Sequence, residues 1–557
     1  MGGRLDLPSR AALPRDLLAG VTLGAAQVGN AMANTMLAGV PPIHGLYGTM
    51  IGTPVGALTS SSQRMTIVTT AALGLAAGSA LAGLAPEQRV AGFITLTVLA
   101  GAIMLAAGLL RAGGLVRFIS NAVMVGFMTG LGVQIALGQL SGLTGYSSSY
   151  ESKMAKAADV LRHIDHIDGA TTLVGLATVA LITIISKTRF RYFSIATALL
   201  VVTAVTTLLD LSLRRVGDIA PISGSFPLPE LPDLSLAPRM LVPAVSLAII
   251  ALVQGAGISR TVPNLDGTRA VASRDFVGQG LANIASGLFG GAAVGGSVQA
   301  TALNVGAGSR TRWSSFFAGA FVVVVVLAAA PLVVQVPESV TSGILIVAAI
   351  SAIRPHAVRA IWAADRLSAL VMAATFMLVL LIPMQYAILA GAGLSVLKYV
   401  YLSSLDVRVV RVVVGADERC RETESPRRLT SADVTVLDIY GSLFFAAGPK
   451  IRESLPAVGE ARSAVVVLRL RGRGTLQSAT IALFRDYAAE LAAGGGRLYL
   501  AGVGPEMLDQ LERTGLLREL GADAVLPATA EYYGSCEAAQ SRGRDWLRTH
   551  GEPRDGG

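Results

Sequence analysis

Two clusters of small and hydroxyl-bearing residues interrupt long apolar stretches of this sequence. One cluster consists of Thr66, Val68, Thr69 and Thr70, and the other of Gly296, Ser297, Val298, Gln299, Ala300 and Thr301. A helix that begins at such a cluster leaves its first backbone N–H groups unpaired and carries roughly half a positive charge there. Two helix N-termini that face each other would therefore hold an anion without a charged side chain. The alternative interpretation is close helix packing, which small residues also favour.

The composition indicates that lipid is the solvent for most of the chain. Of the 557 residues, 52% are hydrophobic and only 15% are charged, and the mean hydropathy is +0.60. A soluble chain would carry about a quarter charged residues. The formal net charge of +9 does not predict nucleic-acid binding, because the arginines alternate with apolar stretches and form no basic stripe.

Apolar segments recur along the first 400 residues and predict an all-α polytopic membrane domain. We expect about fourteen segments, at 17–37, 46–58, 64–84, 90–110, 116–140, 170–186, 192–212, 241–258, 274–290, 298–309, 313–335, 338–353, 367–382 and 385–403. A straight crossing needs about 20 residues, so 46–58 and 298–309 are short. Short, glycine-broken segments at corresponding places in two halves are typical of transporter half-helices, and they predict two inverted sets of seven.

The arginines and lysines predict the orientation. If the N-terminal segment with Arg4, Arg10 and Arg15 is cytosolic, the loops that contain Arg111, Lys187 and Arg310 are cytosolic too. The intervening loops are poorer in net positive charge, which agrees with the positive-inside rule and an even number of crossings. We therefore expect a multi-pass protein of the bacterial inner membrane whose two ends are both cytosolic.

The composition changes after Lys398, and the change predicts the domain boundaries. The expected parts are a cytosolic segment 1–15, a transmembrane domain 16–405, a polar linker 406–431, a small domain 432–545 and a tail 546–557. In the small domain, strand-like stretches such as VTVLDIYGSLFF and SAVVVLRL alternate with helical ones. This alternation predicts an α/β fold with an open sheet.

The sequence predicts neither an enzyme nor a cofactor-binding protein. The GxxxxGK[ST] pattern of a nucleotide-binding loop is absent, and we find no convincing catalytic set or paired carboxylates. The run HIDHID (residues 163–168) has ligand-type residues, but its spacing fits no standard zinc site. We expect no bound metal.

Two longer stretches resemble a known family. DLLAGVTLGAAQVGNAMANTMLAGVPPIHGLYGTMIG (residues 16–52) is similar to the opening of SulP permeases, the sulfate permease family. VASRDFVGQGLANIASGLFGGAAVGGSVQATALNVGAGSRTRW (residues 271–313) carries the family's motifs in order, and the C-terminal domain resembles the STAS domain. The resemblance covers about residues 16–540. It implies a seven-plus-seven inverted repeat with core and gate subdomains, anion transport, and usually a homodimer.

The family register adds two site residues and reveals two departures. Asn30 falls where the family often has a glutamine, and it joins Thr69, Thr70 and the 296–301 stretch as a substrate-binding candidate. Gln254 stands where a glutamate is frequent, and Ala300 where an arginine is common. An acid and a base are thus lost together, which keeps the site near neutral. We hypothesise binding by helix dipoles and neutral donors, which favours a weakly held monovalent anion or even a neutral solute.

The predicted function is alternating-access transport of a small inorganic or organic anion, of the sulfate, bicarbonate, chloride or dicarboxylate class. One alternative is a permease of the same fold for a neutral solute such as a nucleobase. Another is a membrane sensor or scaffold that signals to a cytosolic partner through the STAS domain. Gln477 occupies the position of the aspartate beside the serine that related domains phosphorylate, so the resemblance does not carry that switch over. Arg469, Arg471 and Arg473 are expected in a solvated loop or, alternatively, at an anionic partner or lipid surface.

Overall fold

The computed structural model describes residues 8–114, 120–150, 152–219, 225–414, 420–441, 443 and 447–550. These residues form two compact units, Met1–Ser395 and Val396–Gly557. Parts of the predicted segments 1–15, 116–140, 406–431 and 546–557, including Arg4, lie outside the described residues.

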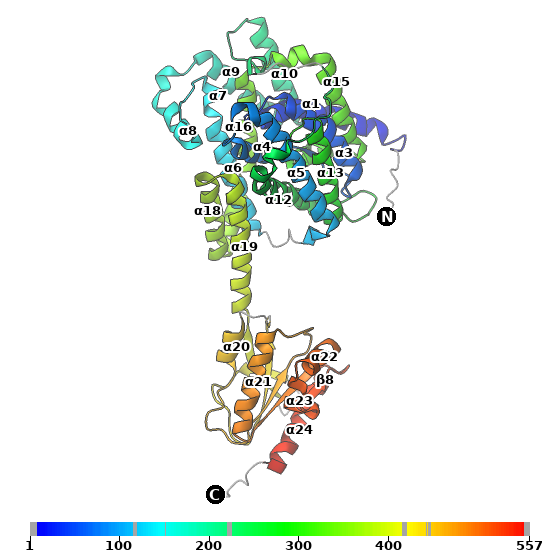
Figure 1. The fold of residues 1–557 in the computed structure, drawn as a ribbon, viewed down its shortest axis with the longest axis vertical. Helices are drawn as coiled ribbons and strands as arrows, with labels where there is room; N and C mark the ends of the chain where they lie inside the picture. The colour runs from blue at the N-terminus through cyan, green and yellow to red at the C-terminus, as the bar shows by residue number, and fades with distance from the viewer. Residues whose placement is uncertain are drawn as a thin grey trace. The chain divides into compact units, whose positions relative to one another are not determined.

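Helices make up most of the first unit (Figure 1). In its first half these are α1 (Leu13–Met36), α2 (Ile43–Tyr47), α3 (Thr53–Thr59), α4 (Ala71–Leu81), α5 (Arg89–Leu109), α6 (Asn121–Gly138), α7 (Leu140–Thr144), α8 (Lys153–Arg162), α9 (Gly169–Ser186) and α10 (Ser194–Leu208). A π-helical turn, Gly48–Gly52, joins α2 to α3. The turn after α1 contains Gly39, whose φ of 70° suits glycine, and prolines 41 and 42 then precede α2.

The second half of the unit repeats the alternation of long and short helices. Its members are α11 (Val216–Ile219), α12 (Ala237–Thr261), α13 (Ala272–Leu288), α14 (Val298–Gly306), α15 (Trp313–Val334), α16 (Glu338–Ala352), α17 (Pro355–Ala364), α18 (Arg366–Leu381) and α19 (Met384–Leu405). Within the described residues, eight helices are long and apolar enough to cross a bilayer. The helices α4 and α14, with 11 and 9 residues, are too short to do so.

The helices of the first unit pack in two groups, each built from both halves of the chain. One group joins α1 and α3–α5 with α12, α13 and α15, and the other joins α6, α7, α9 and α10 with α16 and α18. Small residues bring α5 and α13 into backbone contact, since a Cβ on Gly101 would lie 2.7 Å from the Ile284 nitrogen. The groups meet where α1 contacts α10 and α16. We identify the first group with the expected core and the second with the gate.

The second unit is an α/β domain with a six-stranded mixed sheet in the order β4-β3-β5-β6-β7-β8. The strands are β3 (Arg408–Val414), β4 (Cys420–Glu424), β5 (Val434–Tyr440), β6 (Val465–Arg469), β7 (Arg497–Val503) and β8 (Val525–Pro527). Alternating side chains pack one sheet face on α20 (Gly448–Ser454), α21 (Ser478–Ala493), α22 (Pro505–Arg513) and α23 (Leu516–Leu520), and the other face on α24 (Gly534–His550).

The polar stretch 406–431, expected to be a linker, contributes two strands to this sheet. β3 pairs with β5 and β4 pairs with β3, in both cases antiparallel. The sequence of β4, CRETE, is polar, which is why the stretch resembles a linker. All five of its residues are exposed. A polar edge strand of this kind also protects the sheet from pairing with other chains.

Candidate functional site

The two clusters singled out in the sequence meet in a short antiparallel ribbon inside the first unit. β1 (Ile67–Thr69) pairs with β2 (Val294–Gly296), with Ile67 opposite Gly296 and Thr69 opposite Val294. After β1 the chain enters α4, and after β2 it enters α14. The interruption that the sequence predicts for both segments is therefore present.

The pairing of the ribbon fixes the direction of the two half-helices. Because the strands are antiparallel, α4 and α14 leave from opposite ends of the ribbon. Their N-termini therefore face each other along it, separated by three residue pairs, or on the order of 10 Å. The partial positive charges of both helix ends point into the same small region.

Each half-helix begins at a hydroxyl residue that caps one N–H group and leaves earlier ones unused. The Thr70 hydroxyl accepts from the Leu73 N–H at 3.3 Å, and the Ser297 hydroxyl accepts from the Ala300 N–H at 3.2 Å. The first N–H groups of the two helices belong to Ala71, Ala72, Val298 and Gln299. They have no partner within their own helices, and no bond from them to another described residue is present. These four N–H groups remain available to a ligand.

Three hydrogen bonds join β1 and the residue before it to neighbouring elements. The Asn34 amide of α1 donates to the Thr69 carbonyl oxygen at 3.1 Å. At the other end of the strand, the Thr66 N–H donates to the Thr301 hydroxyl at 3.0 Å, and the Thr66 carbonyl accepts from the Ser297 N–H at 3.0 Å. Non-helical backbone is tolerated at membrane depth only when protein groups pair it in this way.

The outer edge of β2 is held by two amide side chains of α13. Asn283 donates to the Val294 carbonyl at 2.7 Å and accepts from the Val294 N–H at 2.9 Å, as a neighbouring strand would. Gln279 accepts from the Gly296 N–H at 3.2 Å. The residue patterns considered above do not single out Asn34, Gln279 or Asn283 as partners of the ribbon. The available signal was the spacing of Gln279 and Asn283, four residues apart on one helical face within QGLANI.

The two candidates from other helices are placed differently. Gln254 of α12 is buried, and the Thr70 hydroxyl lies 3.5 Å from its Oε1 atom. Asn30 of α1 is half-buried, and its side chain forms no hydrogen bond to a described residue. One helical turn further on, Asn34 reaches the ribbon instead. The structure thus brings Gln254 to the N-terminus of α4, whereas the role of Asn30 stays a prediction.

The six candidates at 296–301 divide into residues that hold the ribbon and residues that are exposed. A Cβ on Gly296 would lie 2.6 Å from the Gly255 Cα, so only glycine fits. Ala300 is buried with Leu23 and Val68, and Thr301 is buried where it pairs with β1. Val298 and Gln299 are exposed in the first turn of α14. The direct solute contacts of this stretch stay a prediction, which now centres on Val298 and Gln299.

Beside the N-terminus of α4 lies a small cavity lined by Asn34, Thr69, Thr70, Phe93 and Ala293, among others. The centre of a water molecule can occupy about 10 Å³ within it, which is room for roughly one water. The Thr69 hydroxyl is buried and has no partner among the described residues. A larger solute therefore requires a movement that opens the space between the two helix groups.

The side chains that hydrogen-bond to the ribbon are all neutral, and the buried carboxylates nearby have structural partners. Asp275 accepts from the N–H and hydroxyl groups of Ser61 and Ser62 and from the Ser259 hydroxyl. Asp16 accepts from the Arg310 and Thr311 N–H groups and from the Thr311 hydroxyl. Both carboxylates fix loops that flank the half-helices, so the electrostatics of the ribbon itself come from backbone dipoles.

Within the described residues, no group of three or more His, Cys, Asp or Glu side chains is arranged to hold a metal ion. In the HIDHID run, His163 lies 3.1 Å from the Asp159 carboxylate and stacks on Tyr146. These contacts give the histidine a structural role in the loop.

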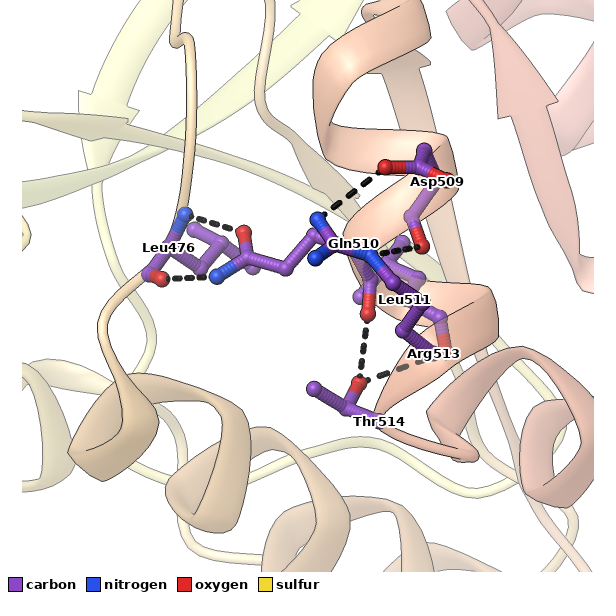
Figure 2. Close-up of polar contacts among 6 residues, drawn as sticks. All are labelled: Leu476, Asp509, Gln510, Leu511, Arg513 and Thr514. Carbon is purple, nitrogen blue, oxygen red and sulfur yellow. Dashed lines mark hydrogen bonds and ion pairs between the residues drawn. The ribbon is translucent and has the colours of Figure 1, made fainter.

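In the second unit, the loop between β6 and α21 is fixed by Gln510 of α22 (Figure 2). The Gln510 amide donates to the Leu476 carbonyl at 2.5 Å and accepts from the Leu476 N–H at 2.8 Å. Gln477 follows directly, and α21 begins at Ser478. A glutamine at this position supplies no carboxylate beside the exposed Ser478, so the departure from the family's aspartate leaves this helix start neutral.

The three arginines of this region bind the domain itself. Arg469 is buried and pairs with Asp438 at 2.5 Å. Arg471 donates to the carbonyls of Thr529 and Glu531 at 2.9 Å, and Arg473 donates to the Gly441 carbonyl at 2.6 Å. The expectation of a solvated loop is therefore wrong for the buried Arg469, and these bonds do not favour a basic docking surface.

In this unit two interrupted segments, β1–α4 and β2–α14, meet among long helices. This arrangement is typical of the broken-helix class of membrane transport folds. The sequence profile of the sulfate permease family matches residues 13–375, and that of the STAS domain matches residues 425–530. Because the first match covers more than half of the chain, the protein belongs to the sulfate permease family.

Relatives and solved structures agree with this assignment. The bicarbonate transporter BicA of Synechocystis sp. is 26% identical over 487 residues, which cover 86% of this chain and 84% of BicA. A probable sulfate transporter of Mycobacterium tuberculosis is 28% identical over 388 residues, 69% of each chain. The fold matches murine Slc26a9, an anion transporter, with a TM-score of 0.83 at 18% identity, covering 96% of this chain and 92% of that one. The transmembrane domain of a cyanobacterial BicA gives 0.61 at 27% identity, covering 68% and 98%.

Proposed function

We propose that this protein moves a small anion across the membrane by alternating access, and that the anion rests between the N-termini of α4 and α14. The observation that carries the proposal is the set of four unused N–H groups at two opposed helix ends. They offer donors and partial positive charge at one place, which suits an anion. The small cavity beside them is consistent with a closed state, from which core and gate move apart to admit solute.

The comparisons support an anion over the two alternatives. The relatives are named for sulfate or bicarbonate transport, and the matching structure is that of an anion transporter. Nothing among them favours a nucleobase permease or a sensor without transport. The same relatives are transporters, which agrees with the expectation that this chain is not an enzyme.

We infer further that the preferred anion is monovalent. Asn34, Gln254, Gln279 and Asn283, which hydrogen-bond to the ribbon and its helix ends, are neutral. Two half-charges of helix ends balance about one negative charge, whereas a divalent anion would retain uncompensated charge in a low-dielectric site. Bicarbonate and chloride fit this balance better than sulfate.

The location and assembly of the protein are also proposals. The arginines and lysines of alternate loops support a cytosolic N-terminus and STAS domain in a bacterial inner membrane. The resemblance supports a homodimer and leaves room for a cytosolic partner of the STAS domain. Labelling of single-cysteine variants in intact cells tests the orientation: a cysteine at Arg310 should be inaccessible from outside, and one at Glu87 accessible.

Flux measurements test the central proposal. The purified chain in proteoliposomes should take up at least one of chloride, bicarbonate, sulfate or a dicarboxylate, and excess uracil should not compete. Uptake of uracil in place of every anion would instead establish a neutral-solute permease. Absence of flux with all of these solutes would contradict transport.

A single substitution then tests the site. Gln299→Glu adds a carboxylate at an exposed position in the first turn of α14, where an acid suits the helix but competes with a bound anion. We expect flux to fall by about tenfold or more, while thermal stability is kept, because like charges in a shielded site repel by more than about 1.4 kcal/mol. Ala170→Glu adds the same charge at an exposed position in the first turn of α9 and should leave flux unchanged. Equal flux in both variants would move the site elsewhere.

A further inference from the structure

A second cavity lies between core and gate, where α1 and α4 end. It is bounded by the turn after α1, the outer turns of α4, the start of α8 and the junction of α18 with α19. The centre of a water molecule can occupy about 600 Å³ within it. This volume is sixty times that of the cavity beside the ribbon, so a small anion enters it together with hydrating water.

Three cations line this second cavity, and none of its lining residues that the structure describes is an acid. Arg89 comes from α5, and Lys153 and Lys156 come from the first turn of α8. In the part of the chain that the structure describes, none of the three side chains forms an ion pair or a hydrogen bond. The Nε atom of Arg89 is fully covered and has no partner there. Buried donors on a charged group are costly when unpaired, and an anion in the cavity removes that cost.

The surroundings of Lys153 raise the electrostatic cost further. Its side-chain carbons pack on α6, where Cδ would lie 3.4 Å from a Cβ on Gly138. Burial and the neighbouring Lys156 lower the pKa of Lys153 to about 8. Among the described residues that line the cavity, the other titratable groups are Arg89 and Lys156, and those of α1, α4, α6, α18 and α19 have none. Lys153 is therefore charged at pH 7 and loses its charge as the pH rises through about 8.

The cavity also lies on a direct route to the ribbon. α4 begins at the ribbon and ends at the cavity, and it is 11 residues long, or about 16 Å. Core elements line one side and gate elements the other, so a movement that opens the ribbon to this end of the unit would open it into the cavity. Three unpaired cations at such a place raise the local concentration of anions.

We propose that this cavity is a second anion site, a vestibule in which Arg89, Lys153 and Lys156 bind a small inorganic anion before it reaches, or after it leaves, the helix N-termini. This proposal rests on the proposed function only in saying that the anion moves between the vestibule and the helix N-termini. Binding of the anion in the vestibule follows from the cavity and its charges alone, so it is testable without flux.

The first experiment measures binding. Trinitrobenzenesulfonate modifies amines, and mass spectrometry of the purified full chain follows its reaction at pH 8 with Lys153 and, for comparison, with the exposed Lys187 that follows α9. Replacing gluconate with chloride at constant ionic strength should slow the reaction of Lys153 several-fold and leave that of Lys187 unchanged. Equal effects of chloride on the two lysines would overturn the proposal, whatever the flux measurements give.

The second experiment measures uptake of whichever of chloride, bicarbonate or sulfate the wild type carries. The double variant Lys153→Met, Lys156→Met should raise KM by about three- to tenfold at low ionic strength and by less than about twofold at 0.5 M salt, because salt screens the vestibule. Lys187→Met is the matched control and should leave KM unchanged. An unchanged KM in the double variant at low salt would overturn the proposal.

A pH series adds a test specific to Lys153. Between pH 7 and pH 9 the wild type should lose affinity, because Lys153 loses its proton over this interval. Lys153→Arg stays charged and should lose less. If the two proteins lose affinity in parallel, the titration belongs to another group and Lys153 is not part of the site. Should the wild type carry no anion at all, the proposed function fails, and the labelling experiment still decides the vestibule.

Discussion

The two units of this protein treat their hydrogen-bond donors in opposite ways. In the second unit, the arginines at the end of β6 and in the loop after it donate to carbonyls and to a buried carboxylate, so these donors are bonded within the domain. In the first unit, Asn34, Gln279 and Asn283 hydrogen-bond to backbone groups at the outer edges of the ribbon. The first N–H groups of α4 and α14, in contrast, form no hydrogen bond to a described residue. Unused donors are costly in lipid. Four such donors at two opposed helix ends are the reason why we propose the ribbon as the binding site.

The largest expected effect is a loss of stability in the second unit, where an arginine is removed from its buried carboxylate partner. Arg469→Met leaves Asp438 buried without its partner in the neighbouring strand, and we expect a loss of about 3–5 kcal/mol in the stability of that unit. Hydrogen exchange of β5 and β6 in the full chain measures the loss. Adding Asp438→Asn removes the second charge and should recover most of the protection. A double variant as labile as the single one would show that the ion pair is not what stabilises these two central strands.

A smaller effect is expected at the edge of the ribbon. Asn283→Leu keeps the side-chain volume but removes the partners of both the Val294 N–H and its carbonyl. Each unpaired group costs about 1–3 kcal/mol, so both thermal stability in detergent and flux should fall. Asn34→Leu deprives only the Thr69 carbonyl and should cost about half as much. Equal losses in the two variants would mean that the ribbon does not depend on its individual pairs.

The substitution expected to disturb stability least tests whether the site must be neutral. Gln254→Glu has the shape of the wild type when protonated, and it places a negative charge beside Thr70 when ionised. Flux of the variant should therefore fall as the pH rises, by about tenfold if the charges repel by roughly 1.4 kcal/mol. The wild type has no acid here and should show no such fall between pH 5 and 7. Parallel pH profiles would argue that the residue at position 254 does not face the solute.

Much of the fold can be predicted from the sequence, because the length of an apolar stretch and the charges around it indicate whether the stretch crosses the membrane. The stretch 313–335 predicts a crossing that the structure shows as α15 (Trp313–Val334), and the alternation after Val434 predicts the α/β domain. The sequence does not predict β4, because a polar edge strand has the composition of a linker, and the valine-rich β3 lies in the same stretch. The two strands depend on tertiary pairing, of β4 with β3 and of β3 with β5, for which the stretch carries no local signal.

The site shows the same division. Glycines and hydroxyl residues identify where α4 and α14 begin, since small residues and helix caps have local signatures. The sequence does not indicate that Gln279 and Asn283 hold the ribbon, that Ala300 is turned into the packing against Leu23, or that Arg469, Arg471 and Arg473 are bound within their own domain. Each of these facts depends on a partner that lies far away in the chain.

By itself, the sequence determined the solvent of each part of the chain, the family, and the two places where helices break. These properties follow from composition and local conformational preference, which act over a few residues. Only the tertiary structure decided that the two breaks pair as an antiparallel ribbon, so that their helix ends face each other, and that Arg89 and Lys153 share one cavity. Such relations join segments as far as 235 residues apart, as Thr66 and Thr301 are, and burial and pairing across the whole unit fix them.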